Sequence, residues 1–247
     1  MRLVVLALVT VPALAAAQPG PDDPTPPGLT PPIIAPAPAP LSPLERADVD
    51  DAAADRAYGT STALVVPRGR IDLSVRGGDG GVVFSAAAGL GSNLELSASL
   101  AGTHDLGFAG GDLKVAVART RTWGLALDAG IHLIGGGDDG ADAPVFNFGG
   151  VFTYVADSAV FSFGGGVAGA SGSGNSPLYA DASIIIGHSA FRPIFEGAIL
   201  AGEDFGFAGA RIGNGHACLD IGVAAGSSGE GSSGVGPLPL VGLTLRP

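Results

Sequence analysis

The chain offers few side chains whose type and spacing suit catalysis. Its four histidines are His104, His132, His188 and His216. Only His104 has a neighbouring carboxylate, Asp105, and adjacent residues on an extended chain point in different directions. His132 alternates in step with Asp128, yet no local sequence around it marks a nucleophile elbow or a metal site. We therefore expect no catalytic residue, no metal site and no cofactor.

Glycine-rich motifs are a second candidate for chemistry. Two Gly-x-Gly-x-x-Gly patterns occur, at Gly164/Gly166/Gly169 and at Gly229/Gly231/Gly234. A nucleotide-binding fingerprint needs a strand, a turn and a helix around it, and neither pattern opens a helix. With 42 glycines in the chain, chance matches are expected. We predict a steric role, in which glycine lets neighbouring side chains fold over a curved sheet.

Small and polar residues, some of them charged, alternate with apolar residues along the long segments of the chain. Leu125 and Leu127 share one face of such a segment, whereas Ala126 and Asp128 share the other. This period of two is typical of a β-strand with two chemically different faces. If the strands close into a barrel, the polar face lines its lumen. The predicted lumen-facing residues are Asp72, Arg76, Glu95, Asp112, Lys114, Asp128, His132, Asp181, Glu196, Arg211, Asp220 and Arg246.

Carboxylates also gather in the breaks between these segments. The formal net charge of −11 argues against a nucleic-acid surface, which needs clustered Lys and Arg. Oxygen ligands suit hard divalent cations, so the acidic loops are a candidate binding region for such ions, although their spacing is not that of an EF-hand. Solubility of exposed loops is the alternative explanation. The predicted acidic outer loops carry Asp79, Asp105, Asp138, Asp139, Asp142, Glu203, Asp204 and Glu230.

The breaks alternate between long and short, which predicts an up-and-down antiparallel β-barrel of about twelve strands. The long breaks are Gly77–Gly81, Thr103–Gly111, Gly135–Pro144, Ser171–Pro177, Gly202–Phe205 and Ser227–Gly236. The short turns are Gly91–Asn93, Thr120–Arg121, Ala156–Ser158, His188–Ser189 and Asn214–Gly215.

The length of the segments favours a membrane, because a tilted strand needs about 9 to 11 residues to cross a bilayer. Outward-facing aromatic residues are also expected near the short turns, where an interfacial girdle belongs. The alternative is a soluble secreted or periplasmic β-sandwich that binds a ligand through its Gly/Ser/Asp-rich loops. A barrel hydrolase of the outer membrane is the third possibility. The predicted girdle consists of Trp123, Phe152, Tyr154, Phe161 and Phe191.

The N-terminal part divides into three predicted regions ahead of the barrel. Residues 1–17 resemble a secretory signal peptide, with Arg2, an apolar stretch and an Ala-x-Ala cleavage site. Residues 18–43 form a proline-rich disordered linker. Residues 44–61 form an acidic linker or a short, solvated helix, and the barrel occupies residues 62–247. The single cysteine, Cys218, cannot form an intramolecular disulfide and is expected to pack in a strand.

Two segments of the sequence resemble a known family of proteins. Pro67–Val75 and Gly89–Leu96 resemble the opening strands of uncharacterised, porin-like outer-membrane β-barrel proteins of proteobacteria. The resemblance implies a Gram-negative outer-membrane location, contact with outer-membrane lipid and handling by the outer-membrane assembly machinery. It implies no particular substrate. The sequence therefore favours a structural or porin-like outer-membrane protein, with a narrow or closed lumen that prefers cations.

Overall fold

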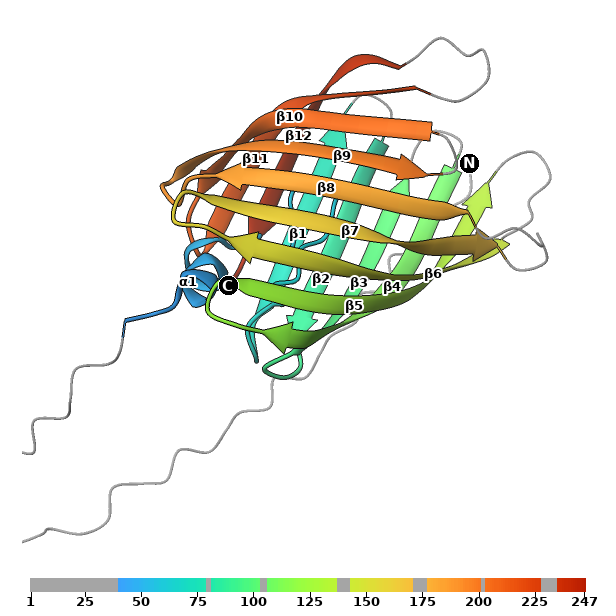
Figure 1. Ribbon diagram of the computed structural model, residues 1–247. Coiled ribbons are helices and arrows are strands. Elements are labelled where there is room, and N and C mark those ends of the chain that lie inside the picture. The colour runs from blue at the N-terminus through green and yellow to red at the C-terminus, as the bar shows by residue number, and fades with distance from the viewer. Residues whose placement is uncertain are drawn as a thin grey trace, which may run out of the picture. The chain divides into compact units, whose positions relative to one another are not determined.

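The computed structural model describes residues 40–78, 81–102, 106–136, 143–170, 177–200, 203–227 and 235–247. Within these residues, twelve antiparallel strands each pair with the next strand along the chain, and β12 pairs with β1, so the sheet closes into a barrel (Figure 1). This confirms the predicted fold class. The strands are β1 (Ile71–Gly78), β2 (Gly81–Gly89), β3 (Leu94–Gly102), β4 (Leu106–Arg119), β5 (Trp123–Gly136), β6 (Ala143–Val155), β7 (Ala159–Ala170), β8 (Leu178–Ile186), β9 (Phe191–Leu200), β10 (Glu203–Gly213), β11 (Ala217–Ser227) and β12 (Val235–Leu245).

The predicted short turns match the structure, whereas several predicted long breaks include residues that belong to strands in the structure. β4 begins at Leu106, inside the expected loop Thr103–Gly111, and its glycines pair with β3 and β5. Only residues 79–80 separate β1 from β2, and only 201–202 separate β9 from β10. Glycine weakens an isolated strand, but hydrogen bonds to neighbours on both sides keep it in the sheet.

Two of the residues assigned to acidic loops lie in a strand instead. Glu203 and Asp204 are the first residues of β10, where they pair with Leu200 and Ile199 of β9, and both are exposed. The prediction failed here because their carboxylates and the preceding glycine imitate loop composition. The other predicted loop carboxylates, Asp79, Asp105, Asp138, Asp139, Asp142 and Glu230, lie outside the described residues.

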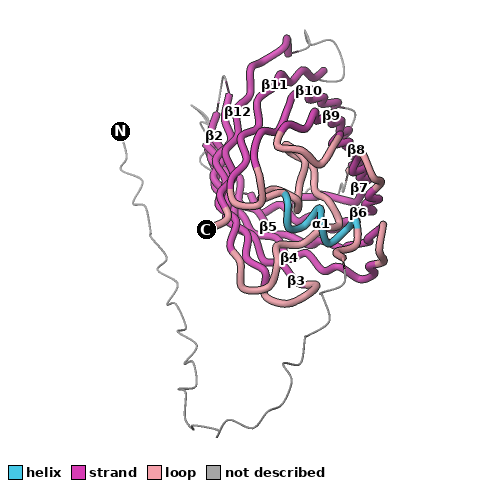
Figure 2. The backbone as a smooth tube through the Cα atoms, turned by 90° about the vertical axis from the view of Figure 1, so that its left-hand side faces the viewer, coloured by secondary structure: helices cyan, strands magenta, loops and turns pink. Residues whose placement is uncertain are grey.

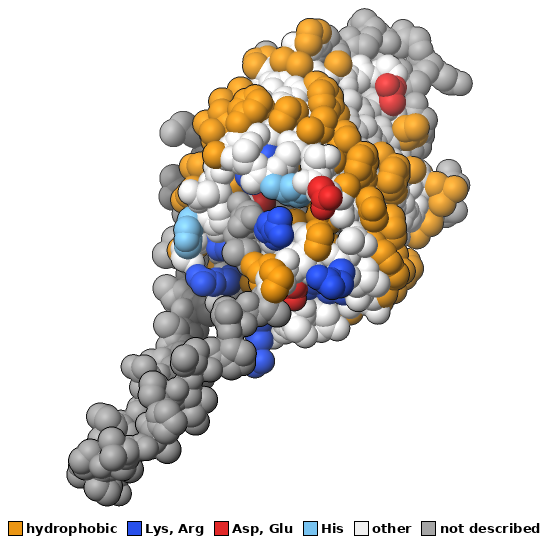
Figure 3. Space-filling model, turned by 60° about the vertical axis from the view of Figure 1, so that its left-hand side comes forward, with side chains coloured by type: hydrophobic (Ala, Val, Ile, Leu, Met, Phe, Trp, Pro, Cys, Tyr) orange, Lys and Arg blue, Asp and Glu red, His pale blue; other side chains and the backbone are white. Residues whose placement is uncertain are grey.

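The outer wall of the barrel is apolar. Large hydrophobic side chains project from alternate positions of every strand, and Figure 3 shows them as bands over the visible wall. A water-soluble protein rarely exposes apolar patches of more than a few hundred Å². No helix among the described residues is long and apolar enough to span a bilayer. Exposed strand residues include Leu73, Phe84, Leu96, Leu100, Leu113, Leu127, Ile131, Leu133, Phe148, Phe163, Phe195, Ile199, Ile221, Val223, Val241 and Leu243.

A short helix, α1 (Pro43–Asp50), lies across the mouth of the barrel at the short-turn end. Its start is explained by the sequence, because Ser42 and Glu45 form a reciprocal capping box and Pro43 occupies the first turn. The Leu44 amide donates to the Arg121 carbonyl between β4 and β5, at 3.2 Å. The Ala52 amide, just past the helix, donates to Asn214 between β10 and β11, at 3.0 Å.

The chain then enters the barrel, turns back and leaves again before β1. Thr62 and Val66 are fully buried, and the backbone folds into a hairpin-like loop with Gly59 near its tip. Figure 2 shows this loop and α1 inside the ring of strands. We call residues 43–66 the plug. The first strand therefore begins at Ile71, not at residue 62, and residues 44–61 are not a solvated linker, since Leu44 and Ala57 are buried.

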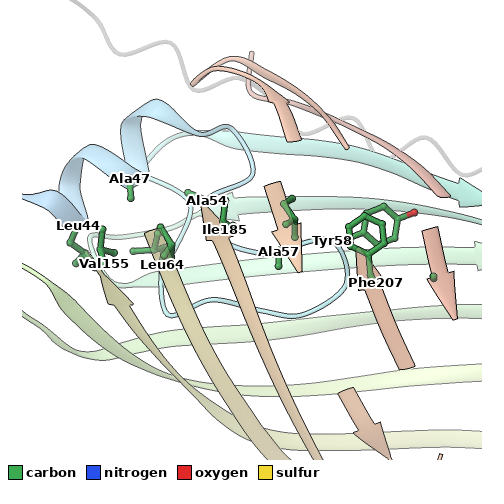
Figure 4. Packing of buried hydrophobic residues seen from close by; sticks show 12 residues of the cluster. Leu44, Ala47, Ala54, Ala57, Tyr58, Leu64, Val155, Ile185 and Phe207 are labelled. Atoms are coloured by element: carbon green, nitrogen blue, oxygen red, sulfur yellow. The ribbon is translucent and has the colours of Figure 1, made fainter. Parts of the chain in front are cut away.

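The apolar core lies between the plug and the inner wall. Leu44, Ala47 and Leu64 of the plug pack with Val155 and Ile185 of the wall (Figure 4). Farther in, the ring of Tyr58 stacks on Phe207 of β10, with 4.4 Å between ring centroids. The plug thus replaces water as the filling of this part of the lumen.

Candidate functional site: the lumen and its plug

Arg211 of β10 is the centre of the contact between wall and plug. It is 0% exposed, and its Nε and Nη2 donate to the two carboxylate oxygens of Asp220 on β11, at 2.8 and 3.1 Å. Its Nη1 donates to Asp51 Oδ2 of the plug at 2.8 Å. The same guanidinium donates to the carbonyls of Ala53, Arg56 and Ala57, at 2.9, 3.2 and 3.0 Å. A buried guanidinium is tolerated only when its donors are satisfied, and here the plug supplies many of the acceptors.

A second anchor comes from β3 and β4. Lys114 Nζ donates to the carbonyls of Asp55 and Thr62, at 3.1 and 3.4 Å, and lies 3.4 Å from Glu95 Oε1. Glu95 Oε2 in turn accepts from the Val66 amide at 2.8 Å. This ion pair therefore holds both limbs of the plug, before and after the tip at Gly59, through backbone atoms.

The tip of the plug is fixed from the opposite wall. The Gly59 amide donates to both carboxylate oxygens of Glu196, at 2.9 and 3.0 Å. A Cβ atom on residue 59 would lie 2.8 Å from Glu196 Oε1, so glycine allows this close approach. Arg76 lies over the Tyr58 ring, with 5.8 Å between its Cζ and the ring centroid.

Two aspartates of the plug remain ionised at neutral pH. Burial raises the pKa of Asp51, but Arg211 and Arg192 lower it by more, so that the net shift is downward. Burial likewise raises the pKa of Asp55, and the charge of Arg56 and other nearby cations outweighs it, leaving the pKa well below its usual range. Both carboxylates therefore contribute to plug retention as anions.

The remaining wall of the lumen carries a hydrogen-bonded row of polar side chains. His132 Nε2 lies 3.1 Å from Asp112 Oδ1 and 2.8 Å from Asn147 Oδ1. Asn147 Nδ2 donates to Asp128 Oδ2 at 3.4 Å, and the His132 ring stacks on Phe108, with 4.9 Å between centroids. These contacts orient His132 in the wall and give it no serine partner.

Glycine on the inner face makes room for that row. A Cβ on Gly130 would collide with Asp112 Oδ1, and one on Gly164 would lie 2.5 Å from Asp181 Oδ2. A Cβ on Gly166 would lie 2.8 Å from Tyr179 Oη. The polar side chains therefore lie flat against the wall over glycines, which is the steric role predicted for Gly164 and Gly166.

The residues predicted to line the lumen fall into two groups by exposure. Asp72, Glu95, Lys114, Glu196, Arg211, Asp220 and Arg246 are buried, and Arg76, Asp112, Asp128, His132 and Asp181 are partly buried. Arg246 binds Asp72 through Nε and Nη2, at 2.7 and 2.8 Å. Arg211 and Asp220 form an ion pair, as do Lys114 and Glu95, whereas Asp181 Oδ1 has no hydrogen-bond partner among the described residues.

Sequence reasoning missed every plug residue, and it missed Arg192. Arg192 of β9 is buried and its Nη2 lies 3.5 Å from Asp51 Oδ1. Cys218 lies in strand β11 as expected, and its thiol donates to the same Asp51 oxygen at 3.0 Å. The capping box at Ser42 was a visible signal for α1, but nothing local showed that the segment after it enters a barrel.

The aromatic residues assigned to a girdle stand at the short-turn ends of their strands. Trp123, Tyr154 and Phe161 are register partners on β5, β6 and β7. The Trp123 and Phe152 rings lie 6.0 Å apart, and Phe191 begins β9. His104, the other histidine considered for catalysis, lies outside the described residues.

No protein-family model and no curated protein matches the sequence. The fold is similar to that of the KdgM porin, with 10% identity and a TM-score of 0.55, over 71% of this chain and 98% of that chain. The KdgM porin in complex with disordered oligogalacturonate gives the same values. LpxR from Salmonella typhimurium is 11% identical over 71% of this chain and 99% of its own, with a TM-score of 0.49. The similarity is one of fold.

Proposed function

We propose that this chain is a porin-like β-barrel of the outer membrane whose passage is closed from the short-turn end by its own plug. The observation that carries the proposal is the plug itself, bound inside a barrel with an apolar outer wall. Passage of small hydrophilic solutes, and not catalysis, is the function that a plugged lumen with a polar lining supports best.

The membrane location rests on the outer wall. Strands of 8 to 14 residues bear exposed leucine, isoleucine, valine and phenylalanine at alternate positions. In a soluble sandwich these residues would pack against a second sheet, whereas here the sheet closes on itself and its polar side chains point to the plug. The fold similarity to the KdgM porin agrees with this location. Lipid is then the partner of the outer wall.

The closed state rests on the number and kind of plug contacts. Arg211, Lys114 and Glu196 bind backbone atoms of the plug, and Arg211 also binds the Asp51 carboxylate, so the wall fixes the path of the plug. For the passage to open, these bonds must break together or the plug must shift as a unit. Residues 1–39, expected to be a signal peptide and most of a proline-rich linker, lie outside the described residues, and residues 40–42 connect them to the plug.

The open passage would favour cations. The row of Asp112, Asp128 and Asp181 lines the wall, and Glu196 would lose its bond to Gly59 once the plug leaves. Carboxylate rings of this kind select cations in pores. Within the described wall, the seven lumen-facing carboxylates Asp72, Glu95, Asp112, Asp128, Asp181, Glu196 and Asp220 outnumber the five cationic side chains Arg76, Lys114, Arg192, Arg211 and Arg246.

Two measurements test the membrane proposal. The full chain should be recovered in the outer-membrane fraction and should change mobility on an SDS gel after boiling. Ile131→Arg, which places a charge on the outer wall at mid-strand, should lower the free energy of unfolding by about 2–4 kcal/mol in a bilayer. The control is Leu90→Arg, at an equally exposed residue in the turn between β2 and β3, with an expected cost of about 0–1 kcal/mol.

A soluble fraction without a heat-dependent shift would overturn the proposal. So would equal stability of both variants, because an exposed isoleucine on a soluble protein tolerates arginine at little cost.

A further inference from the structure

A cavity of about 430 Å³ lies beside the tip of the plug, at the inner faces of β1, β2, β10 and β12. We call it the apolar pocket, because its lining consists of Tyr58, Val83, Phe205, Leu240, four glycines and one charged residue, Arg76. An apolar cavity of about 150 Å³ is large enough to bind benzene. Sites for small molecules have about 300–1,000 Å³ and are lined mainly by hydrophobic and aromatic side chains. The apolar pocket therefore has the size and the lining of a small-molecule site.

Three apolar side chains of the wall converge on this pocket. Val83 of β2 and Phe205 of β10 line it and are 38% and 37% exposed. Phe205 lies two residues before Phe207, which stacks on Tyr58, so both phenylalanines face the inside of the barrel. Leu240 of β12 packs against the buried cluster to which Tyr58 and Phe207 belong. An apolar ligand would remove the exposed part of this surface from water, which is favourable.

The plug closes one side of the pocket. Tyr58 and Gly59 are the plug residues of the lining. In Figure 4, the rings of Tyr58 and Phe207 lie at the end of the buried cluster that is farthest from α1. The pocket is thus at the far end of the plug from α1. When the plug leaves the lumen, the pocket loses this side.

The polar groups of the lining are already engaged or buried. The Tyr58 hydroxyl donates to the Val241 carbonyl at 3.4 Å, and the Gly59 amide donates to Glu196. Nε and Nη2 of Arg76 are buried, so this edge of the guanidinium is not open to a ligand. A molecule rich in hydroxyl groups therefore finds few partners here, whereas the ring of Phe205 can pack on another ring.

We infer that the apolar pocket binds a small, uncharged, apolar ring compound, and that this ligand stabilises the plug in its closed position. Val83, Phe205 and Leu240 supply the wall side of the site, and Tyr58 supplies the plug side. A ligand that binds only the plugged state shifts the equilibrium toward that state by mass action. The inference goes beyond the proposed function, because it assigns to the lumen an effector site in addition to a passage.

The test uses the full-length protein in detergent, with a heat-dependent shift on an SDS gel as proof of folding for every variant. Calorimetric titration compares indole, phenol and cyclohexanol with myo-inositol, which has the ring of cyclohexanol with a hydroxyl group on every carbon. We expect saturable binding of at least one apolar compound, about tenfold or more tighter than that of myo-inositol.

Two neighbouring residues of β2 supply matched variants. Val83→Trp fills the apolar pocket with a ring and should weaken binding by about tenfold or more. Val82, which is 41% exposed, faces the outer wall, so Val82→Trp adds the same ring outside the lumen and should leave the affinity unchanged. Detergent micelles also take up apolar compounds, and titration of Val83→Trp in the same detergent measures that contribution.

Cys218 gives a second readout, which reports on the plug. Its buried thiol bonds to Asp51, so a maleimide reaches it only when the plug moves. At about ten times its dissociation constant, a ligand of the plugged state should slow labelling of Cys218 about tenfold. In Val83→Trp the same concentration should not change the labelling rate.

Equal affinity for myo-inositol would overturn the inference, as would binding no stronger than that of Val83→Trp, or labelling of Cys218 that the ligand leaves unchanged or speeds up. Should Val83→Trp fail to fold, Phe205→Ala takes its place, because it removes a ring from the wall without adding bulk. Failure here is distinguishable from failure of the proposed function. A folded, membrane-extracted barrel that binds no ring compound contradicts only the inference, whereas a soluble protein contradicts the membrane proposal.

Discussion

Replacing Arg211 by glutamine should loosen the plug more than any other single change in the wall. The guanidinium is fully buried and reaches Asp51 together with the carbonyls of Ala53, Arg56 and Ala57. Removing one partner of a buried ion pair costs about 3–5 kcal/mol, because the other charge remains buried. Part of that cost falls on Asp220, which stays in the wall whether or not the plug is bound.

The share that holds the plug can be estimated from its bonds. A hydrogen bond to a charged group contributes about 1.5–3 kcal/mol, and bonds in one network are not additive. We therefore assign about 3 kcal/mol to plug retention. That value raises the open fraction on the order of 100-fold, since about 1.4 kcal/mol corresponds to a factor of ten.

Cys218 supplies the assay without any engineered label site. It is 2% exposed, and its thiol bonds to Asp51 of the plug, so a maleimide reaches it only when the plug moves. When opening is fast compared with labelling, the rate of labelling follows the open fraction. Arg211→Gln should therefore react on the order of 100-fold faster than the wild type.

The matched control is Arg246→Gln. Arg246 is also buried and binds Asp72 of the neighbouring strand with the same two nitrogens that Arg211 offers to Asp220. This variant should lower the temperature at which the SDS-resistant form is lost, with less than a tenfold change in labelling. Wild-type labelling rates in folded Arg211→Gln would refute the reasoning, as would equal acceleration in both variants.

Three further predictions concern the plug and the wall. Glu196→Gln weakens the hydrogen bonds to the Gly59 amide at the tip of the plug, away from Asp51, where the plug covers Cys218, and it should speed Cys218 labelling about tenfold. An unchanged labelling rate would show that the tip does not hold the plug. Because the pKa values of Asp51 and Asp55 are lowered, their contribution to plug retention is complete above the usual aspartate pKa of about 4 and is lost as the pH falls below it. Conductance of the full chain should therefore stay low from pH 8 to 5 and rise only in acid. A transition near neutral pH would contradict this assignment. Gly130→Ala forces Asp112 and Asn147 to move and should destabilise the barrel by about 1–3 kcal/mol in thermal unfolding. The control Gly102→Ala, with open space around its new methyl group, should be close to neutral. Equal effects of the two variants would contradict the steric role given to Gly130.

The barrel could be predicted because the sequence patterns that specify its strands and turns are local. Alternation along Trp123–Leu133 identifies a strand with two faces, and the short turns at Ala156–Ser158 and Asn214–Gly215 set the order of neighbours. The inner residues follow from the same period. Glycine-rich stretches predicted loops less reliably. In β4, pairing with β3 and β5 on both sides overrides the low strand propensity of glycine.

The plug could not be predicted because its contacts are not local. Wall side chains bind its backbone atoms, so residues 51–66 need no repeating pattern of their own. Ala52, Ala53 and Ala57 are fully buried, yet alanine in a short polar stretch does not distinguish a buried segment from a linker. Arg192 was missed for a related reason, because its importance depends on Asp51, far away in the sequence.

Conductance across a planar bilayer tests the central claim most directly. The full chain should insert and remain closed at neutral pH. A chain that begins at Pro67, after the plug, should conduct and should pass cations in preference to anions, provided that its heat-dependent shift on an SDS gel shows a folded barrel; if that chain does not fold, Arg211→Gln in the full chain takes its place. Equal conductance of the full chain and the folded opened form, or no conductance from either, would contradict a lumen closed by residues 43–66.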